Sequence, residues 1–281
     1  MFVLQKNPLI LATAEAAREK IEWARQRLSD ASAGLTFDPG EHKYFLGGRE
    51  LQCVSSIVEG FAPFDTEAKA KRCSTNPRHP LFGHSPEEIM EIWAKKRDDA
   101  AAAGTHVHAF GEACCSFLLG REDEIDPEFR DRITSEGLVA TLPKEESMAR
   151  WWSEYDWSRY AVVAKETRLV NPDLRYAGTF DLLLLDLFED AFCQKDYKTN
   201  EDLNKSFGDK CQPPLDCVLN ADDIGKYTIQ QTLYTIQLRN IGFNVKSNEL
   251  VWLKENGYEI RNLRMDLDTI ISYAVRNRAI N

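Results

Sequence analysis

Four consecutive leucines at positions 182–185 constrain the fold of this chain more than any other feature of its sequence. They belong to a mostly apolar segment, 182–188, which is followed by the polar pair Glu189-Asp190 and then by a short apolar segment, 191–193. This pattern is typical of a buried strand, a turn and a returning strand. The sequence therefore predicts a β-hairpin here.

The hairpin brings two acids and a lysine together. Asp181 precedes the first strand and Asp196 ends the second. If these two residues pair, the turn is centred between Phe188 and Glu189, so the two acids face each other within a residue or two whichever turn type is used. Lys198 stands two residues after Asp196 and therefore shares its face of the strand.

A cation is needed beside two such carboxylates. At a separation of about 4 Å they would repel by about 4 kcal/mol at an effective dielectric constant of about 20. The pair must share a proton, contact cations or bind a metal ion, and Lys198 alone cannot neutralise both charges. A hard divalent ion lowers the pKa of a bound water, which could then attack phosphorus, and the lysine would hold that water or stabilise the developing charge. An isolated Asp-x-Lys is more often a salt bridge at a sheet edge, but the adjoining leucines favour a site.

A helix predicted from Pro86 onward carries the next candidate. His108 and Glu112 are four residues apart, so both share one helical face and could point at a metal ion or its waters. His106 is assigned to an ordinary surface or core position. A histidine on an alanine-rich helix is commonly of that kind, and His108 is favoured only by the family motif described below.

A second helix is predicted over 223–241, because Asp222-Asp223 opens the segment and Gly242 ends it. One polar stripe of this helix, at spacings of four residues, consists of Lys226, Gln230 and Tyr234. The remaining faces, which carry Ile224, Tyr227, Leu233, Ile236 and Leu238, are expected in the core. A polar stripe is normally solvated, but if it faced the hairpin it would bind a phosphate or orient the lysine.

The order of these elements resembles the PD-(D/E)XK nucleases, specifically the RecB-like exonuclease branch. That branch includes phage exonucleases, the mitochondrial genome maintenance exonuclease and the nuclease domains of recombination helicases. The similar segments, in chain order within residues 36–241, are His42-Lys43-Tyr44, Val54-Ser55-Ser56-Ile57-Val58, Gly104-Thr105-His106-Val107-His108, Glu166, Gly178-Thr179-Phe180-Asp181, Asp196-Tyr197-Lys198 and Gln230-Gln231-Thr232-Leu233-Tyr234. Each motif is weak alone, and their order and spacing carry the resemblance. No proline precedes Asp181, a departure that this branch often shows.

The resemblance implies a fold and a set of site residues. The fold is the restriction-endonuclease-like α/β fold, a mixed central sheet flanked by helices, here with an N-terminal helical region. The implied metal ligands are His108, Asp181, Asp196 and the carbonyl of Tyr197. Lys198, Asp181, Asp196 and Glu166 are the implied catalytic residues, while Gln230, Tyr234 and Lys226 would contact the substrate backbone. Residues 162–170 read as a strand with imperfect alternation, so Glu166 could equally be an exposed strand acid.

The implied function is an Mg²⁺- or Mn²⁺-dependent DNA exonuclease that acts on DNA with a free end, with replication or recombination proteins as partners. Three alternatives stay open: an endonuclease, a catalytically idle nucleic-acid-binding or partner-recruiting module, and a hydrolase of small phosphoesters. Strand polarity, strandedness, DNA versus RNA, oligomeric state and pathway are not readable from the sequence.

Composition narrows the class of protein. The chain has 281 residues, 43% of them apolar, enough to bury a substantial core, and we expect residues 1–84 to pack on a nuclease core at 85–281 as one continuous domain. A net charge of −10 argues against a protein that coats nucleic acid non-specifically. Local basic groups could still contact phosphates.

Cysteines and hydropathy indicate the compartment. The seven cysteines include no Cys-x-x-Cys pair, and their odd number suggests reduced thiols. Some relatives bind an iron–sulfur cluster through cysteines beyond the Gln-x-x-x-Tyr motif, but none follows Cys217 here, so no such cluster is expected. No apolar stretch approaches the length of a bilayer span, so we expect a soluble, cytoplasmic protein, in the host cytoplasm if the chain is viral.

The remaining patterns predict the flanking elements. They are a helix over 8–33, a helix capped by Ser85 that Gly104 breaks or restarts, a helical segment 145–158 whose tryptophans lie in the core, a long loop at 200–221, a hairpin turn at 255–257 and a final helix.

Overall fold

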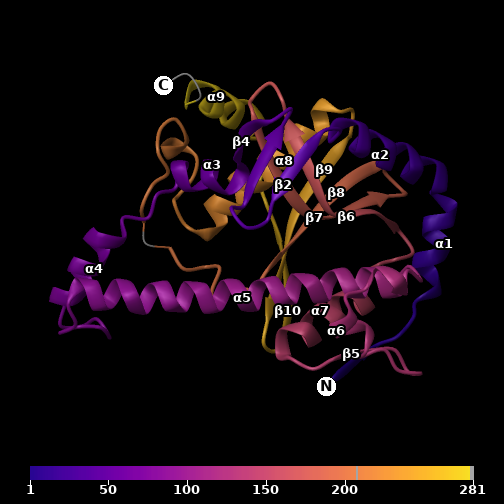
Figure 1. Cartoon of the computed structure of the whole chain (residues 1–281), viewed down its shortest axis with the longest axis horizontal. Helices are drawn as coiled ribbons and strands as arrows, with labels where there is room; N and C mark the ends of the chain where they lie inside the picture. Colours follow the sequence, from indigo (N-terminus) through magenta and orange to yellow (C-terminus); the bar gives the residue numbers. More distant parts are fainter. Residues whose placement is uncertain (207, 279–281) are drawn as a thin grey trace.

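The computed structural model describes residues 1–206 and 208–278, and within them the chain forms a mixed α/β fold around one large sheet (Figure 1). The sheet has the order β10-β9-β8-β7-β4-β3-β2, and β6 pairs along the other edge of β7. Its strands are β2 (Leu35–Asp38), β3 (Lys43–Leu46), β4 (Arg49–Cys53), β6 (Tyr160–Asn171), β7 (Tyr176–Asp186), β8 (Ala191–Lys198), β9 (Val245–Lys254) and β10 (Gly257–Asn262). The β4–β7 and β8–β9 pairs are parallel and the others antiparallel, which confirms the expected mixed sheet.

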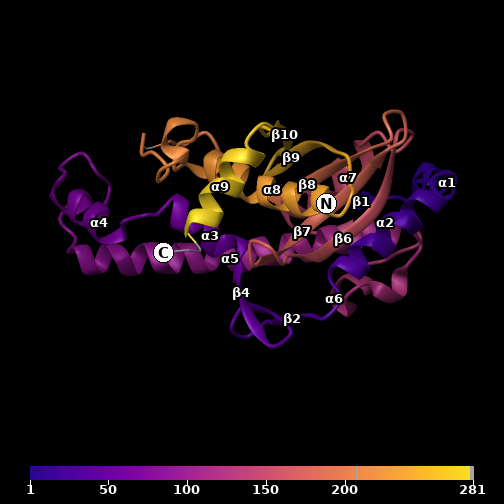
Figure 2. The same ribbon diagram turned by 90° about the horizontal axis from the view of Figure 1, so that it is seen from above.

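Helices flank the sheet on both faces, as expected (Figures 1 and 2). They are α1 (Pro8–Ala16), α2 (Arg18–Ala31), α3 (Val54–Phe61), α4 (Thr66–Thr75), α5 (Pro86–Leu118), α6 (Pro127–Arg130), α7 (Pro143–Glu154), α8 (Asp223–Asn240) and α9 (Asp268–Arg278). One hydrophobic cluster joins the sheet to α2, α3, α8 and α9, and another joins it to α5 and α7. A separate small sheet pairs β1 (Phe2–Leu4) with β5 (Leu138–Ala140).

The four-leucine run of β7 is buried because helices cover the strand on both faces. Leu183 and Leu185 belong to the cluster with α2 and α8, whereas Leu182 and Leu184 belong to the cluster with α5 and α7. None of the four side chains is more than 2% exposed. A strand buried on both faces has a continuous apolar sequence in place of an alternating one.

The register of the central hairpin agrees with the prediction. β7 and β8 pair Leu182 with Lys195, and one further step of the same register sets Asp181 opposite Asp196. The turn is therefore centred between residues 188 and 189, as the sequence predicts. Register fixes which side chains face each other, so this single feature positions the acids of the candidate site.

Several boundaries are also confirmed. The capping box at the start of α5 is formed, because Ser85 Oγ accepts from the Glu88 backbone N–H at 3.2 Å and Glu88 accepts from the Ser85 N–H at 2.8 Å. α8 covers the predicted second helix, and the 255–257 turn joins β9 to β10. The tryptophans of the expected helical segment 145–158 lie in the core, as predicted, but α7 ends at Glu154 and Trp157 lies beyond it.

Two expectations about helices are wrong. The single helix expected over 8–33 is two helices, α1 and α2, divided at Ala17. Gly104 does not interrupt α5, which runs continuously for 33 residues. A Cβ atom at Gly104 would lie 3.3 Å from Thr199 Oγ1, so this glycine allows close packing against the chain after β8.

α5 is longer than the sheet that it supports. Its N-terminal half extends beyond the sheet and packs against α4, so the two helices form a projecting arm (Figures 1 and 2). Its C-terminal half contributes Val107 and Phe110 to the core below the sheet. Across residues 1–206 and 208–278, no helix combines the length and the apolar character that a membrane span requires.

Candidate active site

Side chains from four elements converge at the open end of the central hairpin. β7 supplies Asp181, β8 supplies Asp196 and Lys198, β6 supplies Glu166 and α5 supplies His108. The ligand atoms of His108, Glu166 and Asp181 lie within 4.8 Å of one another. These three residues are 58 and 15 positions apart in the sequence, so the fold alone brings them together.

The imidazole of His108 is oriented by the backbone of β8. Its Nε2 lies 3.0 Å from the carbonyl oxygen of Tyr197, which can only accept, so Nε2 carries the proton and donates. The other nitrogen, Nδ1, faces Asp181 at 3.4 Å and Glu166 at 3.9 Å. A histidine whose far nitrogen donates to a carbonyl is arranged to offer its near lone pair to a metal ion. The Tyr197 carbonyl itself is engaged by His108.

Glu166 has a backbone conformation that no sequence pattern signals. Its φ is +39°, which is rare for a residue with a side chain, in the middle of β6. The strand pairs Lys165 with Leu182 and Thr167 with Phe180, which leaves Glu166 opposite Asp181. The strand also has a register irregularity between Val162 and Ala164, which interrupts the alternation of its faces. The structure places Glu166 in the acid cluster with a half-buried side chain, and not at an exposed strand position.

Asp196 is the most deeply buried acid of the site, at 1% exposure. Its Oδ2 lies 2.5 Å from the ammonium of Lys198. Apart from this ion pair, neither carboxylate oxygen has a hydrogen-bond partner among the residues that the structure describes. Asp181 has one backbone donor, because Tyr197 N–H donates to its Oδ2 at 2.7 Å. Buried carboxylates with so few donors require a further cation.

The pKa values reflect this shortage of positive charge. Burial raises the pKa of Asp196 to about 6 even though the Lys198 charge lowers it. Burial also raises the pKa of Asp181, against the effect of His108. For His108, burial opposes the charged form, but Asp181 and Glu166 outweigh it and raise the pKa to about 9. For Lys198, burial is likewise outweighed by the two aspartates, which raise its pKa above the usual range.

The donor set suits a hard divalent cation. Two carboxylates and one imidazole nitrogen converge, and the charge of a third carboxylate, Asp196, acts on this cluster without belonging to it. Oxygen-rich sites with a single nitrogen are compatible with Mg²⁺ or Mn²⁺. A cation there would keep the acids ionised and satisfy the orphan oxygens of Asp196. The residues present therefore fit such an ion.

Lys198 is held from its other side by an aromatic ring that the sequence analysis assigned to the core. The ammonium lies 4.5 Å from the ring centroid of Tyr227 on α8. The Tyr227 hydroxyl donates to Asn200 at 2.8 Å, and the Asn200 amide donates to Asp223 at 2.8 Å. Tyr227 also packs on the cluster around Leu250 and so keeps part of its expected core role.

The polar stripe of α8 is only partly at the site. Tyr234 is buried, and burial together with the Asp196 charge raises its pKa, against a hydrogen bond with Gln230. A Cβ atom at Gly178 would lie 2.8 Å from the Tyr234 hydroxyl, so only glycine allows the ring to approach β7. Lys226 lies one turn before Gln230. There its charge opposes the rise that burial causes in the pKa of the Cys211 thiol.

The two remaining helix candidates have different surroundings. Glu112 is half-buried, and burial raises its pKa against the charges of Lys165 and His108, which places it beside the site. His106 is directed elsewhere, with its Nε2 2.6 Å from Glu145. It belongs to a structural network with Arg132, as expected for an ordinary histidine.

Comparisons with known proteins give little at the level of sequence. No protein-family model matches the chain, and no curated protein does. Among solved structures, the chain is similar to a candidate exonuclease from Eubacterium rectale, with 14% sequence identity and a TM-score of 0.42. The match covers 82% of this chain and 79% of that chain. This distant likeness carries no argument about the reaction, so the case for one depends on the site.

Proposed function

We propose that this chain is a divalent-metal-dependent deoxyribonuclease with a PD-(D/E)XK-type site, acting as an exonuclease on DNA with a free end. The observation that carries the proposal is the convergence of His108, Glu166 and Asp181 within 4.8 Å, beside the buried ion pair of Asp196 and Lys198. The preference for an exonuclease over an endonuclease follows from the family resemblance.

The metal would be held by Asp181, Asp196, Glu166 and Nδ1 of His108, and when bound it would supply a water of lowered pKa and positive charge at the phosphate. The Tyr197 N–H keeps the Asp181 carboxylate in place for this role. The Tyr197 carbonyl keeps the imidazole turned toward the acids.

Lys198 would be the side chain that assists the attack of water on the phosphate. Its ammonium remains protonated, because two aspartates raise its pKa, so it acts as a hydrogen-bond donor and not as a base. It holds the attacking water in line with the phosphorus and stabilises the charge that develops on the phosphoryl oxygens. Gln230, on the adjoining helix, would contact the DNA backbone, and the buried Tyr234 would position it through their hydrogen bond.

Two other readings compete with this one. A catalytically idle binding module of the same fold needs neither the buried acids nor the lysine, yet each of them is present and assembled. A hydrolase of small phosphoesters would turn over nucleotides but leave polymer intact. Replication or recombination proteins are proposed partners on the resemblance alone.

The experiment is cleavage of end-labelled linear single-stranded, linear duplex and circular DNA, with magnesium, manganese or chelator. We expect metal-dependent loss of linear DNA, survival of circles, and loss of activity in Lys198→Ala and Asp196→Ala proteins that remain folded. Full activity of either variant would exclude the assigned site. Absence of cleavage by the folded wild type on every substrate would favour the binding module.

A further inference from the structure

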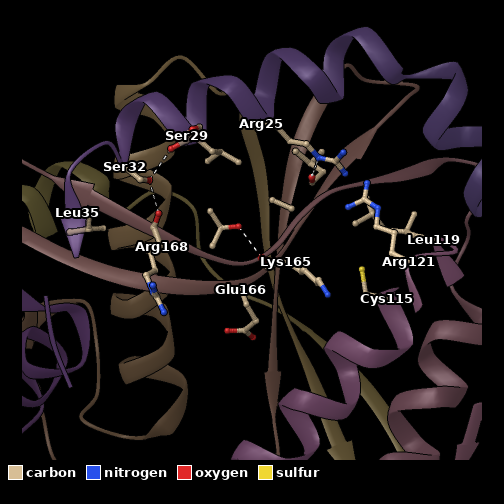
Figure 3. Close-up of a pocket in the computed structure, with 15 residues that line it drawn as sticks. Arg25, Ser29, Ser32, Leu35, Cys115, Leu119, Arg121, Lys165, Glu166 and Arg168 are labelled. Atoms are coloured by element: carbon tan, nitrogen blue, oxygen red, sulfur yellow. Dashed lines mark hydrogen bonds between the residues drawn. The ribbon is translucent and has the colours of Figure 1, made fainter. Parts of the chain in front are cut away.

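A cavity of about 640 Å³ lies directly beside the acid cluster, with which its lining shares Glu166. It is formed by α2, the C-terminal end of α5 and β6, which pairs with β7 on one edge and faces the cavity with the other (Figure 3). The lining residues are Arg25, Leu28, Ser29, Ser32, Leu35, Cys115, Leu119, Arg121 and the β6 segment 162–168.

Positive charge is concentrated in this cavity. Four cationic side chains line it, Arg25, Arg121, Lys165 and Arg168, against one lining carboxylate, Glu166. Arg25 and Arg121 approach each other across the cavity mouth (Figure 3). Burial and the nearby Arg121 charge both lower the pKa of Arg25, and the charges of Glu124 and Glu22 oppose this effect without cancelling it.

Acids outside the cavity lining act on these cations. Glu124 lies 3.7 Å from Arg121 and 3.5 Å from Lys165, so one half-exposed carboxylate serves two cations. The charge of Glu22 also acts on Arg25, and Glu112 interacts electrostatically with Lys165. Lys165 also donates to the Ser116 hydroxyl, and the Arg25 Nε donates to the Val163 carbonyl at 2.8 Å. Neither of these partners carries a charge. The rest of each cation's donor capacity is available to an anion with several oxygens.

Apolar side chains line the cavity among the charged ones. They are Leu28, Leu35 and Leu119, together with Val162 and Ala164 of β6, and Leu119 lies beside Arg121 (Figure 3). A cavity of this volume, lined by apolar residues and a few polar groups, matches the general character of small-molecule sites. A bare inorganic anion would contact only the charged residues of the cavity and leave the apolar ones without a partner.

The cavity and the acid cluster share Glu166. This residue lines the cavity, and its carboxylate lies with His108 and Asp181 in the cluster. In Figure 3 the side chain of Glu166 extends away from α2, whereas Arg25 enters from α2. An occupant of the cavity would therefore lie on the other side of β6 from the acids, one strand away from the reacting phosphate.

We infer that this cavity binds a nucleoside phosphate, with the phosphoryl group between Arg25, Arg121 and Lys165 and the sugar and base against the lining leucines. The occupant has two sources, the terminal nucleotide of a DNA strand or a free nucleoside monophosphate such as the reaction would release. The first source rests on the proposed nuclease function, and the second does not.

The experiment measures binding without cleavage. Fluorescence anisotropy in chelator gives the affinity of the protein for one oligonucleotide bearing a 5′-phosphate, a 3′-phosphate or no terminal phosphate. Unlabelled nucleoside monophosphate and inorganic phosphate serve as competitors. The variants are Arg121→Gln and Arg25→Gln, and the matched control is Arg27→Gln, an exposed arginine of the same helix that does not line the cavity.

We expect one terminal phosphate to tighten binding by about tenfold or more, since charge-assisted hydrogen bonds to two arginines are formed. Arg121→Gln and Arg25→Gln should abolish this gain, while Arg27→Gln keeps it. If a free nucleoside monophosphate binds, and the same two variants weaken it, but end phosphorylation has no effect, the free product is the occupant. The Arg25 side chain also donates to the Val163 carbonyl, so its replacement could unfold the protein. In that case the affinity of the Arg121→Gln variant alone tests the inference.

Equal affinity for all three oligonucleotides, together with no binding of the monophosphate by the folded wild type, would overturn the inference. So would phosphate-dependent binding that survives both arginine substitutions. Because no metal is present, either result is independent of cleavage. Failure of the nuclease assignment would instead appear as activity without Lys198, or as no activity at all.

Discussion

Tyr227 supports the ammonium of Lys198 with its ring face, at 4.5 Å from the ring centroid. The contact is fixed from behind, because the Tyr227 hydroxyl is tied to Asn200 and through it to Asp223 at the start of α8. The lysine therefore sits between Asp196 on one side and an aromatic face on the other. This arrangement limits its rotamers more than the ion pair alone would.

Removing the ring should slow the chemical step. We expect Tyr227→Leu to lower the single-turnover cleavage rate by between about threefold and about thirtyfold, the range of a cation–π contact, with DNA affinity unchanged. Tyr227→Phe keeps the ring and should retain most of the rate. In a protein that already carries Lys198→Ala, Tyr227→Leu should not lower the cleavage rate further. A full additional loss there would show that Tyr227 acts on the fold and not on the lysine.

Glu166→Gln should weaken metal binding and leave the fold intact. The change removes one of the charges within 4.8 Å of His108 and Asp181, and the affinity of a divalent site depends on its ligand charge. We expect the manganese concentration at half-maximal binding, measured by calorimetry, to rise about tenfold or more. Glu91→Gln, which changes an exposed acid near the start of α5, is the matched control. An unchanged Glu166→Gln titration would remove this residue from the site.

In chelator, the free energy of unfolding should fall as the pH rises. The folded-state pKa of Asp196 is about 6 and that of His108 about 9, both above their unfolded values, so the folded state binds both protons more tightly. Their stabilising contributions are complete below the unfolded pKa values and are lost as the pH rises through the folded ones. Denaturant titrations between about pH 5 and about pH 9 measure this slope.

Two neutral substitutions test the origin of that slope. Asp196→Asn should flatten it at the acidic end, and His108→Gln at the alkaline end, because each removes one titration. Saturating metal should also flatten it by holding both residues in their ion-binding forms. A slope that persists in the double variant would have to come from other groups.

Gly178→Ala should destabilise the protein by about 1–3 kcal/mol, the usual cost of inserting a methyl group into a filled space. The added Cβ would lie 2.8 Å from the Tyr234 ring and 2.9 Å from Val54, on opposite sides. Gly104→Ala is the control, since its Cβ would meet only Thr199 Oγ1, at 3.3 Å. Equal thermal denaturation midpoints for the two variants would contradict the packing argument.

The central hairpin was predictable from the sequence because its determinants are local. A strand buried on both faces leaves an unbroken apolar run, and the polar turn fixes the register, so Asp181 and Asp196 could be set opposite each other without any tertiary information. The start of α5 was equally predictable, since a capping box involves four consecutive residues.

Other parts of the site depend on contacts between distant segments. Glu166 reaches the acids through a left-handed backbone conformation that neighbouring strands impose, and no alternation pattern signals it. The ring of Tyr227 contacts Lys198 although α8 begins 25 positions after the end of β8, so the contact depends on tertiary packing. Gly104 appeared to break a helix, yet packing against Thr199 outweighs its low helix propensity. The arginine-lined cavity combines segments from residues 25 to 168.

The projecting arm and His108 are parts of one uninterrupted helix. From Pro86 to His108 the axis of α5 extends about 33 Å, at about 1.5 Å per residue, with no proline or kink after its first turn. The arm and the imidazole therefore belong to a single secondary-structure element, with no loop between them. A ligand that held the arm in a different orientation relative to the sheet would also have to bend α5 or move His108.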